Sequence, residues 1–101
     1  MYDVVIVGAG PAGLFSAYEL VTKTKLKVLL LDEGSFAKNR VCPMNKNHIP
    51  CVNCKTCSIM SGYGGAGTFS DGKLNFIPKL GKSDLFKYMS KEEAYNIIDE
   101  T

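Results

Sequence analysis

The sequence predicts an α/β fold that opens with a strand, a helix and a second strand parallel to the first. Two short apolar runs, Asp3–Val7 and Lys27–Leu31, are rich in branched residues and too brief for helices, which is typical of strands buried on both faces of a sheet. Between them, small and apolar residues over Gly13–Leu20 recur at helical spacing and share one face. These observations predict a βαβ unit over residues 1–34.

The turn between the first strand and the helix carries the run Gly-Ala-Gly-Pro-Ala-Gly, which has the spacing of a dinucleotide-binding loop. In such a loop Gly8 permits the tight turn, Gly10 leaves room for a pyrophosphate at the backbone, and Gly13 lets the helix pack closely on the strand. Pro11 and Ala12 open the helix, where free N–H groups and the helix dipole favour phosphate. We therefore predict a Rossmann-like unit with cofactor contacts from all five of these residues.

An acidic residue ends the second predicted strand. Asp32 lies 19 residues after Gly13, where a carboxylate accepts hydrogen bonds from an adenosine ribose. Glu33 is the alternative acid, but the strand more naturally ends at Asp32, which leaves Glu33 as a solvated neighbour. Arg40, the chain's only arginine, follows closely and is either a contact to a cofactor phosphate or ribose or a surface charge.

Four cysteines, Cys42, Cys51, Cys54 and Cys57, lie within sixteen residues. In a cytosolic protein such clustering favours metal binding or redox chemistry over disulfides, and four thiolates can hold zinc or an iron–sulfur cluster. The spacing matches neither zinc ribbons nor bacterial ferredoxins. A zinc or iron–sulfur site, reactive thiols near a flavin, and inert reduced thiols therefore stay open as alternatives.

Residues 61–74 form a second glycine-rich stretch, which holds five of the ten glycines. Small residues allow the backbone to approach a ligand closely. We predict that this stretch contacts the cofactor through Gly64, Gly65, Ala66 and Gly67, and the alternative is a flexible loop.

The last part of the chain carries weaker signals. Lys73–Ile77 alternates in polarity like a short strand, and Ser83 is placed to cap a short helix that ends at Tyr88. Ser90 and Glu93 have the spacing of a capping box for a final helix.

Length, composition and charge narrow the class of protein. The chain has 101 residues, of which 46% are hydrophobic and 22% charged, and its net charge is +2. No run is long enough for a membrane span, no signal-peptide pattern opens the chain, and no basic stripe appears. We expect a cytoplasmic protein that binds neither membrane nor nucleic acid.

A βαβ unit alone buries little surface, and the chain ends inside a helical pattern. We therefore expect a partial cofactor-binding domain, the N-terminal piece of a longer enzyme. Its parts are the βαβ unit, a cysteine- and glycine-rich loop region and a truncated helical part, which span residues 1–34, 35–82 and 83–101.

Val4–Gly34 resembles the FAD-binding N-terminus of the glutathione-reductase-like flavoproteins. Three further features resemble a group within them, bacterial proteins described only as FAD-dependent dehydrogenases or oxidoreductases; these are Arg40–Pro43, the last three cysteines and Gly64–Leu74. The resemblance implies FAD, with its ADP part at the first glycine loop and Asp32, and it places Gly64–Gly67 toward the flavin. It supplies no substrate or electron donor.

We expect the chain to be the FAD-binding part of a flavin-dependent oxidoreductase that acts on a small molecule, inactive in isolation. One alternative is an oxidoreductase in which the βαβ unit binds NAD. The other is a non-catalytic module that binds a metal ion or iron–sulfur cluster through the four cysteines.

Overall fold

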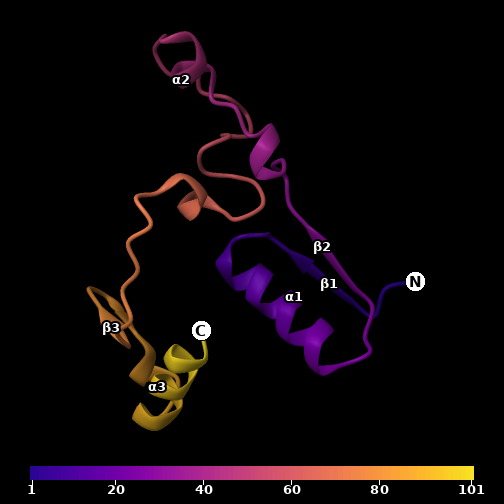
Figure 1. Ribbon diagram of the computed structural model, residues 1–101, viewed down its shortest axis with the longest axis vertical. Coiled ribbons are helices and arrows are strands. Elements are labelled where there is room, and N and C mark those ends of the chain that lie inside the picture. Colours follow the sequence, from indigo (N-terminus) through magenta and orange to yellow (C-terminus); the bar gives the residue numbers. More distant parts are fainter.

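The first 34 residues form a parallel strand pair with a connecting helix. The computed structural model describes residues 1–101, and its strands β1 (Val4–Val7) and β2 (Val28–Leu31) pair in parallel, with Val4 opposite Val28. Helix α1 (Pro11–Lys23) joins them and lies along the pair (Figure 1). The fold is α/β as predicted, and this arrangement is compatible with the start of a Rossmann-like unit.

Close packing of α1 on the strands depends on the helix face predicted from the sequence. Gly13, Ala17 and Leu20 are partly covered, whereas most residues between them are exposed. A Cβ atom at Gly13 would overlap the carbonyl oxygen of Gly8, so only glycine lets the helix start this close to the end of β1. The predicted packing role of Gly13 is confirmed.

The prediction that the strands are buried on both faces is wrong. Along β1, Val4 and Ile6 are half-buried, but Val5 and Val7 are 55% and 84% exposed. The reason is that α1 covers one face of the strand pair, and no other element packs on the opposite face.

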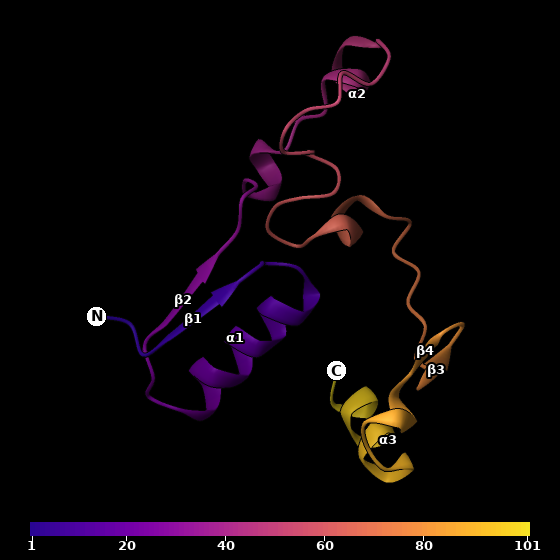
Figure 2. The same cartoon turned by 180° about the vertical axis from the view of Figure 1, so that it is seen from behind.

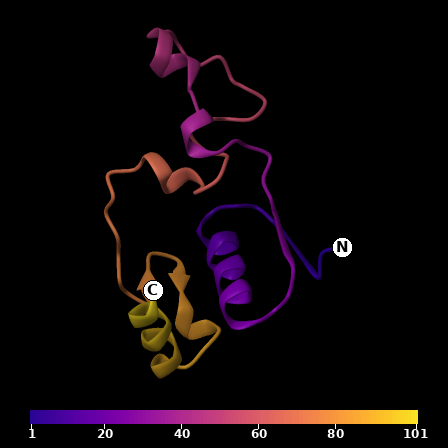
Figure 3. The same ribbon diagram turned by 45° about the vertical axis from the view of Figure 1, so that its right-hand side comes forward.

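Beyond β2 the chain makes only short elements. They are the helix α2 (Pro43–Asn47), the strands β3 (Lys79–Leu80) and β4 (Ser83–Asp84), the helix α3 (Lys91–Glu100), and the 3-10 turns η1 (Ala37–Asn39), η2 (Ala66–Phe69) and η3 (Leu85–Lys87). Figures 1 and 2 show α2 at the tip of an arm at one end of the molecule and α3 toward the other end. Figure 3 shows the irregular stretch that connects η2 to the β3–β4 hairpin. The result is a flat molecule of 48 × 41 × 19 Å.

Of the signals in the C-terminal part, one is confirmed and two are corrected. The Ser90–Glu93 capping box forms at the start of α3. Lys73–Ile77 is not a strand, because no partner segment lies beside it to complete a ladder. Ser83 lies in β4 and caps nothing, since the carboxylate of Asp84 accepts the Phe86 N–H instead.

The fold encloses almost no apolar core. Five of the 101 residues are buried, and no large side chain is fully buried. None of the helices combines the length and apolar character needed to cross a membrane. The order of the central region therefore depends on backbone and polar contacts rather than on packed aliphatic side chains.

We predict that Gly13→Ala destabilises the full-length natural protein. Alanine normally stabilises a helix interior by about 1 kcal/mol relative to glycine, whereas overpacking costs about 1–3 kcal/mol. The overlap with the Gly8 carbonyl should therefore lower the midpoint of thermal unfolding. Gly67→Ala is the control, because a Cβ there meets no atom within 4 Å. Equal midpoints for the two variants would contradict the packing argument.

Candidate functional site

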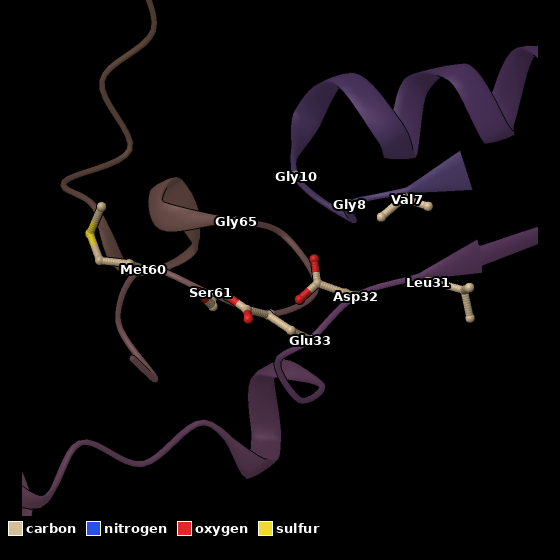
Figure 4. Close-up of a pocket in the computed structure, with 10 residues that line it drawn as sticks. Val7, Gly8, Gly10, Leu31, Asp32, Glu33, Met60, Ser61 and Gly65 are labelled. Carbon is tan, nitrogen blue, oxygen red and sulfur yellow. Dashed lines mark hydrogen bonds between the residues drawn. The ribbon is translucent and has the colours of Figure 1, made fainter. Parts of the chain in front are cut away.

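A cleft of about 490 Å³ lies at the ends of β1 and β2 (Figure 4). Both glycine-rich segments and both candidate acids reach it, and its walls are made by Val7, Gly8, Gly10, Leu31, Asp32, Glu33, Met60, Ser61, Gly62 and Gly65. The carboxyl ends of parallel strands are where α/β sheets bind ligands. The structure thus brings the two predicted loops together at one site.

The first glycine loop presents open backbone to this cleft. Gly8 has a φ of +103°, a conformation that favours glycine, and its N–H donates to the Leu31 carbonyl at 2.7 Å. A Cβ atom at Gly10 would meet no protein atom within 4 Å, so the space in front of this residue is free. Pro11 occupies the first position of α1, and the N–H groups of Ala12 and Gly13 donate to no protein acceptor. This is the arrangement of a phosphate-binding helix start.

Asp32 joins the ends of the two strands. One carboxylate oxygen accepts the Ala9 N–H at 2.8 Å, and the other accepts the Gly34 N–H at 2.8 Å. The hydrogen bond from Ala9 and then the one from Gly34 hold the pKa of this carboxyl below its ordinary value. A carboxylate has about four acceptor positions, so both oxygens can accept further donors from a ligand.

Glu33 has a separate role in the structure. Its carboxylate accepts the Ser61 hydroxyl at 3.0 Å, which links the end of β2 to the second glycine-rich stretch. Glu33 is therefore more than the solvated neighbour that the sequence suggested. Contact of either acid with a cofactor stays a prediction.

The second glycine-rich stretch is docked on the βαβ unit. The Gly64 N–H donates to the Ala9 carbonyl at 2.8 Å, and the Tyr63 hydroxyl donates to the Leu30 carbonyl at 3.1 Å. The Tyr63 ring stacks on Phe36 with 4.4 Å between centroids. These contacts argue against a freely flexible loop.

Of the four residues predicted in this stretch, only Gly65 lines the cleft. Gly64, Ala66 and Gly67 are not part of the cleft wall. The wall instead includes three residues that the sequence analysis did not predict, which are Met60, Ser61 and Gly62. Ser61 and Gly62 belong to the same glycine-rich stretch, which was the available signal. The composition marks the segment, but only the folded loop decides which of its residues face the cleft.

Arg40 is not a surface charge, so that alternative is wrong. Arg40 is only 7% exposed. Its guanidinium donates to the Gly65 carbonyl in the second glycine-rich stretch and to the carbonyls of Ser58 and Ile59 just before that stretch. It does not line the cleft. A direct contact between Arg40 and a cofactor stays a prediction; each of its three nitrogens already donates to a protein acceptor.

The four cysteines are not gathered into a site. Cys42 is half-buried at the start of α2, while the other three are exposed on the same arm, and all four are free thiols. No three histidine, cysteine or acidic side chains lie close enough together to hold a metal ion. A metal or cluster role for these cysteines stays a prediction.

Comparisons with known proteins match only short parts of the chain. Residues 1–37 match the Thi4 family. An uncharacterized protein of Methanosarcina barkeri is 51% identical over 41 residues, which cover 41% of this chain and 10% of that protein. A protein of Marinomonas mediterranea named "Putative FAD-dependent oxidoreductase LodB" is 45% identical over 40 residues, which cover 40% of this chain and 11% of that protein. The match thus spans about a tenth of the length of these relatives, and no solved structure matches the chain.

We predict that Asp32→Asn lowers stability with a distinct dependence on pH. In the natural protein, stabilisation by the carboxylate is present above the unfolded-state pKa of about 3.9 and is lost as the pH falls through the lower folded-state pKa. The asparagine amide would instead set an N–H group against the N–H of Ala9 or Gly34. The variant should be less stable than the natural protein at neutral pH, and the difference in stability between the two proteins should become smaller below about pH 3.9.

The measurement is the unfolding midpoint of both proteins between acid and neutral pH. Glu33→Gln is the control, because its amide oxygen can still accept the Ser61 hydroxyl. Parallel curves for the natural protein and Asp32→Asn would contradict the role of the Asp32 carboxylate.

Proposed function

We propose that this chain forms the ADP-binding part of a flavin-dependent oxidoreductase and that FAD is its cofactor. The observation that carries the proposal is the convergence of the open Gly10 backbone and the Asp32 carboxylate on one cleft at the carboxyl ends of two parallel strands. Neither feature alone is specific, but together they provide for a pyrophosphate and a ribose at adjacent positions.

In this proposal different residues of the cleft bind different parts of the nucleotide. The Gly8–Gly13 loop and the free N–H groups at the start of α1 hold the pyrophosphate. Asp32 accepts ribose hydroxyls through the acceptor positions that Ala9 and Gly34 leave free. Gly62 and Gly65 form the opposite wall, where the lack of side chains allows close approach. FAD, when bound, supplies the redox chemistry, and the protein supplies binding and orientation.

The comparisons support this proposal without extending it to a reaction. The Thi4 match covers the βαβ unit, and the name of the Marinomonas relative describes it as an FAD-dependent oxidoreductase. No substrate or electron donor follows from either.

An NAD-dependent oxidoreductase is the second candidate, because an acid at the position of Asp32 suits the ribose of NAD as well as that of FAD. An absorption spectrum of the purified full-length protein separates the two. A bound flavin spectrum supports FAD, whereas a colourless protein that binds NAD would replace the proposal.

We predict that Gly10→Val abolishes FAD retention while leaving the fold intact. The backbone here is extended, with φ −77° and ψ −174°, and a side chain added at Gly10 starts from a Cβ atom that meets no protein atom within 4 Å. It would therefore compete only with the ligand. The measurement is bound flavin per folded protein after purification of the full-length variant.

The matched control is Ala37→Val, which adds a branched side chain on the exposed turn η1 outside the cleft. Normal flavin content in folded Gly10→Val would refute the site, and flavin loss in both variants would show that the effect is not local.

A further inference from the structure

The only buried charged side chain lies directly behind the cleft. Arg40 donates from Nε to the Ser58 carbonyl at 2.8 Å and from Nη2 to the Ile59 carbonyl at 2.7 Å. From Nη1 it reaches the Gly65 carbonyl and the Thr68 hydroxyl, both at 3.0 Å. One planar group therefore joins Ser58 and Ile59, just before the second glycine-rich stretch, to Gly65 and Thr68 within it.

All of the acceptors of Arg40 are carbonyl or hydroxyl oxygens, and none is a carboxylate. Neither of the two ion pairs in the structure involves Arg40. Its guanidinium also lies 4.9 Å from the centre of the Phe69 ring. The guanidinium presents five donors in a fixed plane and so spans acceptors that lie farther apart than the three donors of a compact lysine ammonium can reach together.

Two cleft residues are positioned through this group. A Cβ at Gly62 would lie 2.6 Å from Cδ of Arg40, so the loop rests directly on the arginine stem. The Gly65 carbonyl accepts from Arg40, while a Cβ on Gly65 would lie 3.1 Å from the Cα of Gly10. The residue held by the guanidinium is thus the one that approaches the first glycine loop.

We infer that Arg40 is a positioning residue for the cofactor cleft: it sets the distance between the second glycine-rich stretch and Gly10, and so sets the affinity for the ADP part of the cofactor without touching it. The inference rests on the proposed function. The contacts from Gly64 to Ala9 and from Tyr63 to Leu30 attach the stretch to the βαβ unit, but neither holds the Gly65 carbonyl. That carbonyl accepts from Arg40 and from the Thr68 hydroxyl, both at 3.0 Å, and more weakly from the Thr68 N–H at 3.4 Å; of these donors, only Arg40 comes from outside the stretch.

The experiment measures dissociation constants of FAD and of ADP for the full-length protein freed of cofactor, together with unfolding midpoints. Arg40→Lys keeps the charge and loses the fork, and it should weaken both ligands about ten- to a hundredfold. Lys38→Arg is the matched control, because it also exchanges one cation for another; Lys38 is an exposed residue two positions earlier whose side chain makes no hydrogen bond or ion pair, and this variant should bind as the natural protein does.

Chemical rescue tests the geometry rather than the stability. For Arg40→Ala, millimolar guanidinium should restore ADP affinity, and ammonium at equal ionic strength should not, because the planar ion places its donors far enough apart to span the acceptors of Arg40 and the compact ammonium ion does not. If the Arg40 variants do not fold, Thr68→Val decides, since it removes the hydroxyl that accepts from Arg40 and that donates with it to the Gly65 carbonyl. A severalfold loss of ADP affinity at an unchanged unfolding midpoint would support the inference.

Three results separate failure of this inference from failure of the proposed function. Arg40→Lys with natural ADP affinity and a lowered unfolding midpoint would show that Arg40 supports only the fold. Natural affinity in Thr68→Val, where the Arg40 variants do not fold, would overturn the inference as well. A natural protein that binds neither FAD nor ADP would instead overturn the proposed function, and the inference with it.

Discussion

The bridge made by the Asp32 carboxylate is the constraint on which the site depends. By accepting N–H groups from Ala9 and Gly34, it joins the turn after β1 to the turn after β2. The chain after Gly34 then runs out through η1 to the arm that carries α2, and it returns to line the cleft at Met60, Ser61, Gly62 and Gly65. Hydrogen bonds to a charged acceptor are stronger than those between neutral groups, which suits this carboxylate to hold two irregular segments.

The second glycine-rich stretch is ordered by the same kind of interaction. Its contacts are backbone and side-chain hydrogen bonds to Ala9, Leu30 and Arg40, together with one stacked pair of rings. Glycines make this possible, because a side chain at Gly62 would collide with the Arg40 stem. Close approach of backbone to backbone thus replaces the packing of large apolar side chains in this region.

The stability of a fold built in this way depends strongly on whether a ligand is bound. With so few buried apolar residues, little of the free energy of folding comes from a hydrophobic core. A ligand that binds only the folded cleft adds its binding free energy to the stability of the fold. Val5 and Val7 are exposed on the face of the strand pair that α1 leaves uncovered; Val5 takes no part in the cleft, whereas Val7 lines its wall.

The local elements of this protein are determined by the sequence itself. Short branched runs, the glycine spacing and the Ser90–Glu93 box predicted β1, α1, β2 and α3; the two helices depend on contacts between residues near one another in the chain, whereas β1 and β2 pair with each other across 24 residues. Patterns that needed a distant partner were less informative, and for that reason Lys73–Ile77 was mistaken for a strand. The sequence indicated correctly where β2 ends. The choice of Asp32 over Glu33 as the acid that binds the ribose was based on that end and stays a prediction.

Only the tertiary structure decided how the loops combine. Whether Arg40 is exposed depends on carbonyls 18 to 25 residues away, and no local pattern records that proximity. The same is true of Gly62 and Ser61, which become cleft residues because Glu33 and Arg40 hold them there. Conversely, clustering of the cysteines in sequence did not bring them together in space, since an exposed arm lacks the packing that would close four thiols on one point. Local propensity is a property of neighbouring residues, whereas a binding site is set by long-range hydrogen bonds that form only in the folded chain.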